Sequence, residues 1–168
     1  MDDYLYEAFI TYKHDKVDTR VAKDVQNYLE HYRIPPDLQK LSGIKKFKKV
    51  FRDTTELSGT NDLTKEIEDA LIHSRFLIVI CSDKTKESIW VPREIEIFLK
   101  HHDEEHILTV LAGGEPPGVI PDILLKRMVQ DSTEKKRLLK RWNRFLVISE
   151  RNLGGPGVKK YPALRQDF

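Results

Sequence analysis

Short apolar runs and longer stretches with helical spacing alternate along this chain. The apolar runs predict strands over residues 6–11, 48–51, 76–81 and 107–112. Apolar residues that recur every three or four positions predict helices over residues 20–33, 63–74 and 90–100. This alternation indicates an α/β fold in which helices cover a parallel sheet.

The last third of the chain has a less regular pattern. Asp131 and Glu134 can form a capping box for a helix over residues 135–145. The run FLVIS, which begins at Phe145, is equally consistent with a strand. We therefore expect one domain over residues 1–168, with a core at about residues 6–112 and a less certain part at residues 113–168.

Composition sets limits on the class of protein. The 168 residues carry a net charge of +2, which by itself indicates no partner. The single cysteine, Cys81, lies in the apolar run FLIVIC and is expected to be a buried, structural thiol. No run approaches the ~20 apolar residues of a membrane helix, and the acidic N-terminus is unlike a signal peptide. We expect a cytoplasmic protein with no membrane partner.

One pair of residues combines an aromatic ring and a carboxylate. Trp90 and Glu94 are four positions apart, so they lie on one side of the helix predicted after the loop at residues 82–88. That helix begins beyond the carboxyl end of a buried strand, where ligands of open parallel sheets bind. Spacing alone also permits a core or edge tryptophan beside a solvated glutamate, so it does not decide between the two interpretations.

Three separated motifs resemble the Toll/interleukin-1 receptor (TIR) domain family. They are FITYKHD, VFRDTTELSG and FLIVICSDKTKESIWVPREI, and they occur in the family's order over about residues 6–111. The resemblance implies a flavodoxin-like three-layer sandwich, with a central parallel sheet of about five strands and helices on both faces. It also leans toward the bacterial members of the family and implies a role in bacterial defence or signalling.

The resemblance implies an activity as well as a fold. Family members that cleave NAD carry a glutamate four residues after a tryptophan, and this chain has that pair as Trp90 and Glu94. Glu94 would stabilise the oxocarbenium-like ribose as nicotinamide leaves, and Trp90 would form a wall of the pocket. NAD is then the substrate and no cofactor is expected. The products are nicotinamide and ADP-ribose, either linear or cyclic.

Residues of the first loop are implied to bind the same substrate. Tyr12, Lys13 and His14 occupy the positions that approach the nucleotide, with Lys13 as a partner for the diphosphate. A solvated lysine and histidine are the alternative for this loop. Ser88 matches the family's Ser-x-Trp pattern, and its hydroxyl is expected to cap the following helix.

The loop at residues 53–62 corresponds to the mobile loop of the family. The resemblance implies that it gates the pocket and contacts a neighbouring copy, with Leu57 and Gly59 as its hinge and contact residues. Arg52 and Asp53 precede or begin this loop, and we expect an ion pair there that shapes it. The resemblance also implies homotypic self-association. The chain is expected to be a fragment of a longer sensor-effector protein, with a sensor domain or partner protein outside it.

Two other functions remain open at the level of sequence. One is a scaffold that only recruits other TIR domains, and the other is an enzyme like nucleoside deoxyribosyltransferases, in which a glutamate attacks a ribosyl carbon. A metal site is not expected, because the six histidines show no HExxH spacing. Nucleic acid is not expected either, since the basic stretches IKKFKKVFR and KKRLLKRWNR are typical of a solvated strand edge and helix face.

Overall fold

A five-stranded parallel sheet forms the centre of the protein. The computed structural model describes residues 4–54, 65–130 and 145–147. All neighbouring strands pair in parallel, in the order β2-β1-β3-β4-β5. The strands are β1 (Tyr6–Thr11), β2 (Val50–Arg52), β3 (Ser74–Cys81), β4 (Ile107–Leu111) and β5 (Phe145–Val147). This order confirms the prediction of a flavodoxin-like sheet of about five strands.

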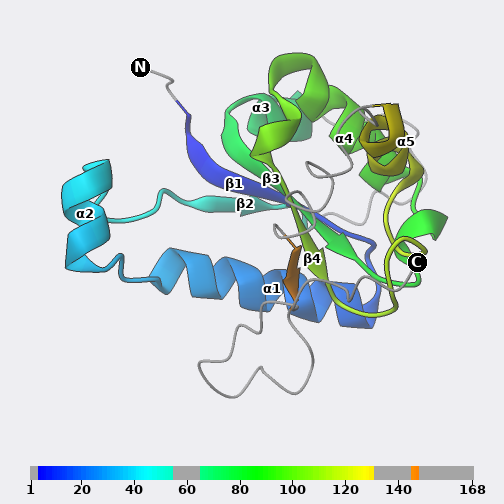
Figure 1. Cartoon of the computed structure of the whole chain (residues 1–168), viewed down its shortest axis with the longest axis horizontal. Coiled ribbons are helices and arrows are strands. Elements are labelled where there is room, and N and C mark those ends of the chain that lie inside the picture. The colour runs from blue at the N-terminus through cyan, green and yellow to red at the C-terminus, as the bar shows by residue number, and fades with distance from the viewer. Residues whose placement is uncertain (1–3, 55–64, 131–144, 148–168) are drawn as a thin grey trace.

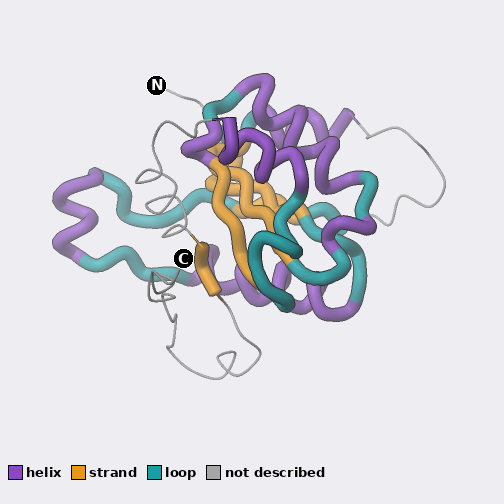
Figure 2. The backbone as a smooth tube through the Cα atoms, turned by 45° about the vertical axis from the view of Figure 1, so that its right-hand side comes forward, coloured by secondary structure: helices purple, strands orange, loops and turns teal. Residues whose placement is uncertain are grey.

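Helices cover both faces of the sheet, as predicted (Figure 1). The helix α1 (Lys16–His31) lies along one face, and α3 (Lys65–Ile72), α4 (Trp90–His101) and α5 (Asp122–Gln130) lie on the other. Successive strand residues point to opposite faces, so Phe9 packs with α3 and α4 while Ala8 and Ile10 pack with α1. Figure 2 shows the strands as one layer between these helices.

Several element boundaries differ from the predicted ones. The helix α1 begins at Lys16 instead of residue 20, because Asp15 caps it by accepting a hydrogen bond from the Asp18 amide. Strand β2 begins two residues later than predicted, and β3 begins at Ser74. Phe145 starts a strand, which supports the strand interpretation of FLVIS, and the other residues of the helix predicted over 135–145 lie outside the described residues.

Two helices have no counterpart in the sequence prediction. The first is the short helix α2 (Pro36–Ser42), which begins at a proline. Proline is compatible with the first helical turn because its missing N–H would have no partner there. The second is α5. Short 3-10 turns occupy Thr85–Glu87 and Glu104–His106.

The carboxyl ends of β1, β2 and β3 meet at one edge of the sheet. Thr11 at the end of β1 pairs with Val79 of β3, and Ile10 pairs with Arg52 at the end of β2. After β1 the chain forms β2 on one side of β1, and the next strand, β3, lies on the other side of β1. This is the topological switch point, at which parallel sheets bind ligands. None of the described helices has both the length and the apolar character that crossing a membrane requires.

Candidate active site

Glu94 is a buried carboxylate on the core-facing side of α4. The buried residues of this helix are Val91, Glu94, Ile95 and Phe98, which is the spacing of one apolar stripe. Only 4% of Glu94 is exposed. Burial raises the pKa of the Glu94 carboxyl to about 8, and the negative charge of Asp53 adds to this rise. The free protein therefore holds this carboxyl largely protonated at neutral pH.

The Thr11 hydroxyl lies against this carboxyl. It opposes part of the rise in the Glu94 pKa, because a hydroxyl donor favours the charged form. Thr11 is 1% exposed, yet its Oγ1 completes no hydrogen bond of standard geometry within the described residues. Sequence analysis did not identify Thr11. Its position as the last residue of β1, at the edge where ligands bind, was the available indication.

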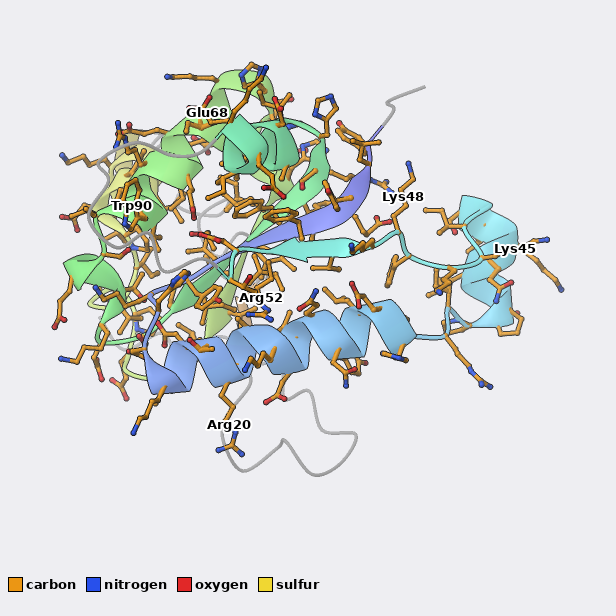
Figure 3. The ribbon with its side chains drawn as sticks, turned by 180° about the vertical axis from the view of Figure 1, so that it is seen from behind. Arg20, Lys45, Lys48, Arg52, Glu68 and Trp90 are labelled. Carbon is orange, nitrogen blue, oxygen red and sulfur yellow. The ribbon has the colours of Figure 1, made fainter. Side chains whose placement is uncertain are left out.

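Trp90 lies one helical turn before Glu94, at the start of α4 (Figure 3). Its ring is half-buried, and the Arg93 guanidinium lies 5.8 Å from the ring centroid. The Ser88 hydroxyl accepts hydrogen bonds from the amides of Trp90 and Val91, each at 3.3 Å. Ser88 thus has the expected capping contacts, and it fixes the backbone from which the Trp90 side chain extends.

Tyr12 is a buried residue directly after β1. It was expected to approach the nucleotide from the first loop, and that role stays a prediction; the residue is only 6% exposed and packs against the α1 side of the sheet. Its hydroxyl donates to the Asp53 carbonyl at 2.6 Å and accepts from Arg52 Nη1 at 3.1 Å. Burial raises the Tyr12 pKa, and Arg52 opposes that rise. Tyr12 therefore fastens the end of β2 to the end of β1.

Arg52 extends from β2 toward α1, where Nε donates to Gln26 Oε1 at 2.9 Å (Figure 3). Through Tyr12 it is linked to the backbone of Asp53, which is 7% exposed. These contacts hold the first residue of the 53–62 loop in place. The direct ion pair between Arg52 and Asp53 stays a prediction, and Leu57 and Gly59 lie outside the described residues.

Lys13 and His14 follow β1 and are both half-buried. The His14 ring packs against Tyr12, with ring centroids 4.6 Å apart. A hydrogen bond from the Lys13 backbone amide favours the charged form of the Asp18 carboxyl and so opposes the rise in its pKa. The structure therefore brings Tyr12, Lys13 and His14 to the same edge as Glu94, with Tyr12 as the buried member.

Asp18 is a second buried acid at this edge, and sequence analysis missed it. It is 0% exposed, and Ser82 Oγ donates to its Oδ2 at 2.9 Å. Burial raises the Asp18 pKa to about 6. The hydrogen bond joins the start of α1 to the loop after β3. Asp18 lies on the buried stripe of α1 with Val21, Ala22 and Val25. An acid on an apolar helix stripe was the signal in the sequence that could have identified Asp18 as buried, and the same signal applies to Glu94.

The loop that leads to α4 is held from two sides. Thr85 Oγ1 accepts from the Ser82 amide at 2.7 Å and donates to the Ile80 carbonyl at 3.2 Å. Gly114 has φ +72, and a Cβ there would lie 2.3 Å from Asp83 Oδ1. Glycine at this position lets the loop after β4 pack against the loop after β3. Trp90 and Glu94 are thus supported by a fixed backbone.

Metal ligands do not gather at this edge. Within residues 4–54, 65–130 and 145–147, no three His, Cys, Asp or Glu side chains are placed to hold a metal ion. His101, His102 and His106 line a groove of about 420 Å³ at the other end of α4, away from Glu94. Cys81 is fully buried and free, and burial raises its thiol pKa to about 12. This agrees with the structural role expected for Cys81.

Comparisons with known proteins give one family match and two similar proteins. The family model described as "Thoeris protein ThsB, TIR-like domain" matches residues 9–116, which include Thr11, Arg52 and Glu94. The protein named NAD(+) hydrolase ApTIR from Actinoplanes sp. is 34% identical over 114 residues, covering 66% of this chain. This chain spans only 14% of the length of that relative. The TIR domains of the activated Roq1 resistosome, which recognises the pathogen effector XopQ, match with a TM-score of 0.46 and 18% identity, covering 81% of this chain and 78% of theirs.

Proposed function

This chain belongs to the TIR-like domain family of Thoeris protein ThsB, and from that premise we propose that it cleaves NAD between nicotinamide and ribose. The observation that carries the proposal is the burial of Glu94 at the switch point of the sheet. An acid that serves only solubility lies in water, because a buried carboxylate reduces stability. The relative named as an NAD(+) hydrolase supports the same reaction.

The chemistry requires an anion beside the ribose. When the bond between C1′ and the nicotinamide nitrogen breaks, its electron pair goes to the positively charged ring, which leaves as neutral nicotinamide. Positive charge then develops on the ribose, and the ionised Glu94 would stabilise it. Water forms the new bond to C1′, and its proton passes to the carboxylate or to solvent. The products are nicotinamide and ADP-ribose.

The raised pKa of Glu94 adds a condition to this mechanism. A carboxyl with a pKa of about 8 is largely neutral in the free protein at pH 7. The cationic nicotinamide ring of bound NAD would favour the ionised form, because an opposite charge nearby lowers a carboxyl pKa. Substrate binding would thus generate the anion that the reaction uses, and the same group is suited to accept a proton from water.

The surrounding residues have supporting roles in this proposal. Trp90 would form a wall beside the nicotinamide or the ribose, and Lys13 would contact the diphosphate. Thr11 would donate its unused hydroxyl to Glu94 or to a ribose oxygen. Ser88 positions Trp90 through the helix cap, while Tyr12 and Arg52 fix the start of the loop at residues 53–62.

Self-association belongs to the same proposal. We infer from the TIR resemblance that copies of this chain assemble, that the loop at residues 53–62 contacts a neighbouring copy, and that assembly raises activity in bacterial defence. A sensor domain or partner protein would control that assembly. Cyclisation of the product is a variant of the same reaction, in which a hydroxyl of ADP-ribose replaces water.

The proposal is tested by incubating the purified chain with NAD and quantifying nicotinamide and ADP-ribose, linear and cyclic. We expect the amount of nicotinamide to equal the summed amounts of linear and cyclic ADP-ribose. We also expect the rate per protein molecule to rise with protein concentration. No product at any concentration, including with a crowding agent, would instead support the scaffold function. A covalent sugar trapped on Glu94 from a deoxynucleoside would support a deoxyribosyltransferase.

A further inference from the structure

A short helix and the strand entry that follows it form a basic surface that the proposed reaction does not use. We call residues 33–49 the basic tip; it contains α2 and the stretch that leads into β2. The helix α2 has no buried residue and projects from the body of the protein (Figures 1 and 2). Its conformation is held locally, since Gly43 at φ +70 ends it and Ser42 Oγ donates to the Leu38 carbonyl.

Two leucines on α2 are exposed to solvent. Leu41 is 84% exposed and Leu38 is 51% exposed. Three positions separate them, so they lie on the same side of the helix. Isolated surface leucines are ordinary, but a projecting pair on a helix without a buried face points to a partner.

Positive charge surrounds these leucines. The basic tip contains six basic residues and one acidic residue, a net charge of +5, whereas the whole chain carries +2. The basic residues are Arg33, Lys40, Lys45, Lys46, Lys48 and Lys49, and all six are exposed. Lys46, Lys48 and Lys49 also line a groove of about 330 Å³ beside the end of α1. The partner is therefore expected to be anionic.

The basic tip lies at the opposite edge of the sheet from Glu94. Residues 43–49 enter the amino end of β2, whereas Glu94 is next to Thr11 at the carboxyl end of β1. Figure 3 shows Lys45 and Lys48 at one end of the molecule and Trp90 at the other. A partner bound to the tip would leave the candidate active site open.

We propose that the basic tip docks reversibly on the surface of an anionic lipid bilayer. Leu38 and Leu41 would enter the boundary between headgroups and acyl chains, and the lysines would lie against the negatively charged headgroups. The expectation of no membrane partner rested on the lack of a spanning segment, and a peripheral contact needs none. The inference does not depend on NAD cleavage.

Two other occupants fit the surface less well. A second copy could present Glu66, Glu68 and Asp69, which are exposed on α3, but none of the large exposed hydrophobic side chains of the described residues lies on that helix to receive the leucines. Single-stranded nucleic acid would match the lysines and use aromatic rings for stacking. Tyr32 already packs against Phe47 at 5.9 Å and against Tyr28 at 5.5 Å, and the leucines would have no role.

The test is co-sedimentation of the full chain with vesicles. Vesicles of phosphatidylcholine alone are compared with vesicles that contain about one third phosphatidylglycerol. Because each lysine near an anionic surface contributes about fivefold in affinity, we expect at least about tenfold tighter binding to the anionic vesicles. Raising the salt concentration to about 0.5 M should remove most of that difference.

Paired variants separate the two parts of the surface. Lys45→Glu with Lys46→Glu, and separately Leu38→Ser with Leu41→Ser, should each weaken vesicle binding by about tenfold or more. The matched control, Lys23→Glu with Lys65→Glu, makes the same charge change at exposed positions on α1 and α3 and should bind within about twofold of the parent chain. All variants should keep the parent's circular dichroism spectrum, because none alters a buried side chain.

Four results would overturn the proposal. The first is equal binding to neutral and anionic vesicles, and the second is an equal loss in the control variant. The third combines two measurements: the leucine variant binds vesicles like the parent chain, and the parent chain binds a single-stranded oligonucleotide that the lysine variant no longer binds. That result would assign the tip to nucleic acid. Association of the chain without vesicles that both tip variants abolish would likewise assign it to a second copy.

Discussion

Glu94→Gln is expected to lower kcat/KM for NAD by about 10²- to 10⁴-fold. Glutamine keeps the size of the side chain and can still contact the Thr11 hydroxyl, but it cannot become the anion that opposes the charge on the ribose. The measurement is nicotinamide release at a protein concentration where the parent chain is active. Most of the loss should appear in kcat, because the interaction is strongest in the transition state, and a smaller rise in KM should reflect the lost contact with the cationic ring of bound NAD.

Glu96→Gln is the matched control for this prediction. Glu96 lies two residues further along α4 and is exposed, so the same change of chemistry occurs outside the site. Its kcat/KM should remain within about twofold of the parent value. Equal turnover by the parent chain and Glu94→Gln would remove Glu94 from the mechanism, whatever the control shows.

The same substitution should stabilise the fold above neutral pH. In the unfolded chain the Glu94 pKa is near 4.5, and in the folded chain it is about 8. Below pH 4.5 the carboxyl is protonated in both states and has no effect on the free energy of unfolding. Between these two pKa values only the unfolded chain releases the proton, so stability falls as pH rises; above pH 8 the loss is constant.

Glu94→Gln has no such proton to lose. Its advantage over the parent chain in free energy of unfolding should therefore grow between pH 5 and pH 9, by an amount on the order of 3–5 kcal/mol. Urea unfolding at several pH values measures this difference, and Glu96→Gln should follow the parent chain throughout. An advantage that stays constant with pH would show that the Glu94 pKa is not raised in the folded protein.

Much of the fold follows from local pattern. Strand β1 has the predicted bounds, and β4 and α4 differ from theirs by one residue. Their alternation predicted a parallel sheet correctly because buried strands and amphipathic helices have distinct periods. The helix α2 was missed for the converse reason, since it has no buried residue and so leaves no apolar stripe in the sequence.

The candidate site was only partly predictable. Trp90 and Glu94 were found through their motif, because spacing alone did not separate a buried acid from a solvated one. Contacts between distant residues gave no local pattern: the Tyr12 hydroxyl reaches Asp53, 41 positions away. Asp18 and Ser82 are 64 positions apart, and they meet only because the start of α1 and the loop after β3 lie at the same edge of the sheet. The buried contact of Tyr12 was therefore not predicted, and its contact with the substrate stays a prediction.

The pH dependence of kcat/KM for NAD tests the central claim most directly, since that claim is that a buried Glu94 acts in its ionised form. This parameter reports the ionisation of the free protein. Because the Glu94 pKa is about 8, kcat/KM should rise by about tenfold per pH unit well below pH 8 and level off above it. The small residual rate of Glu94→Gln should lack this inflection. A kcat/KM that is independent of pH, or that falls as pH rises through 8, would contradict the account.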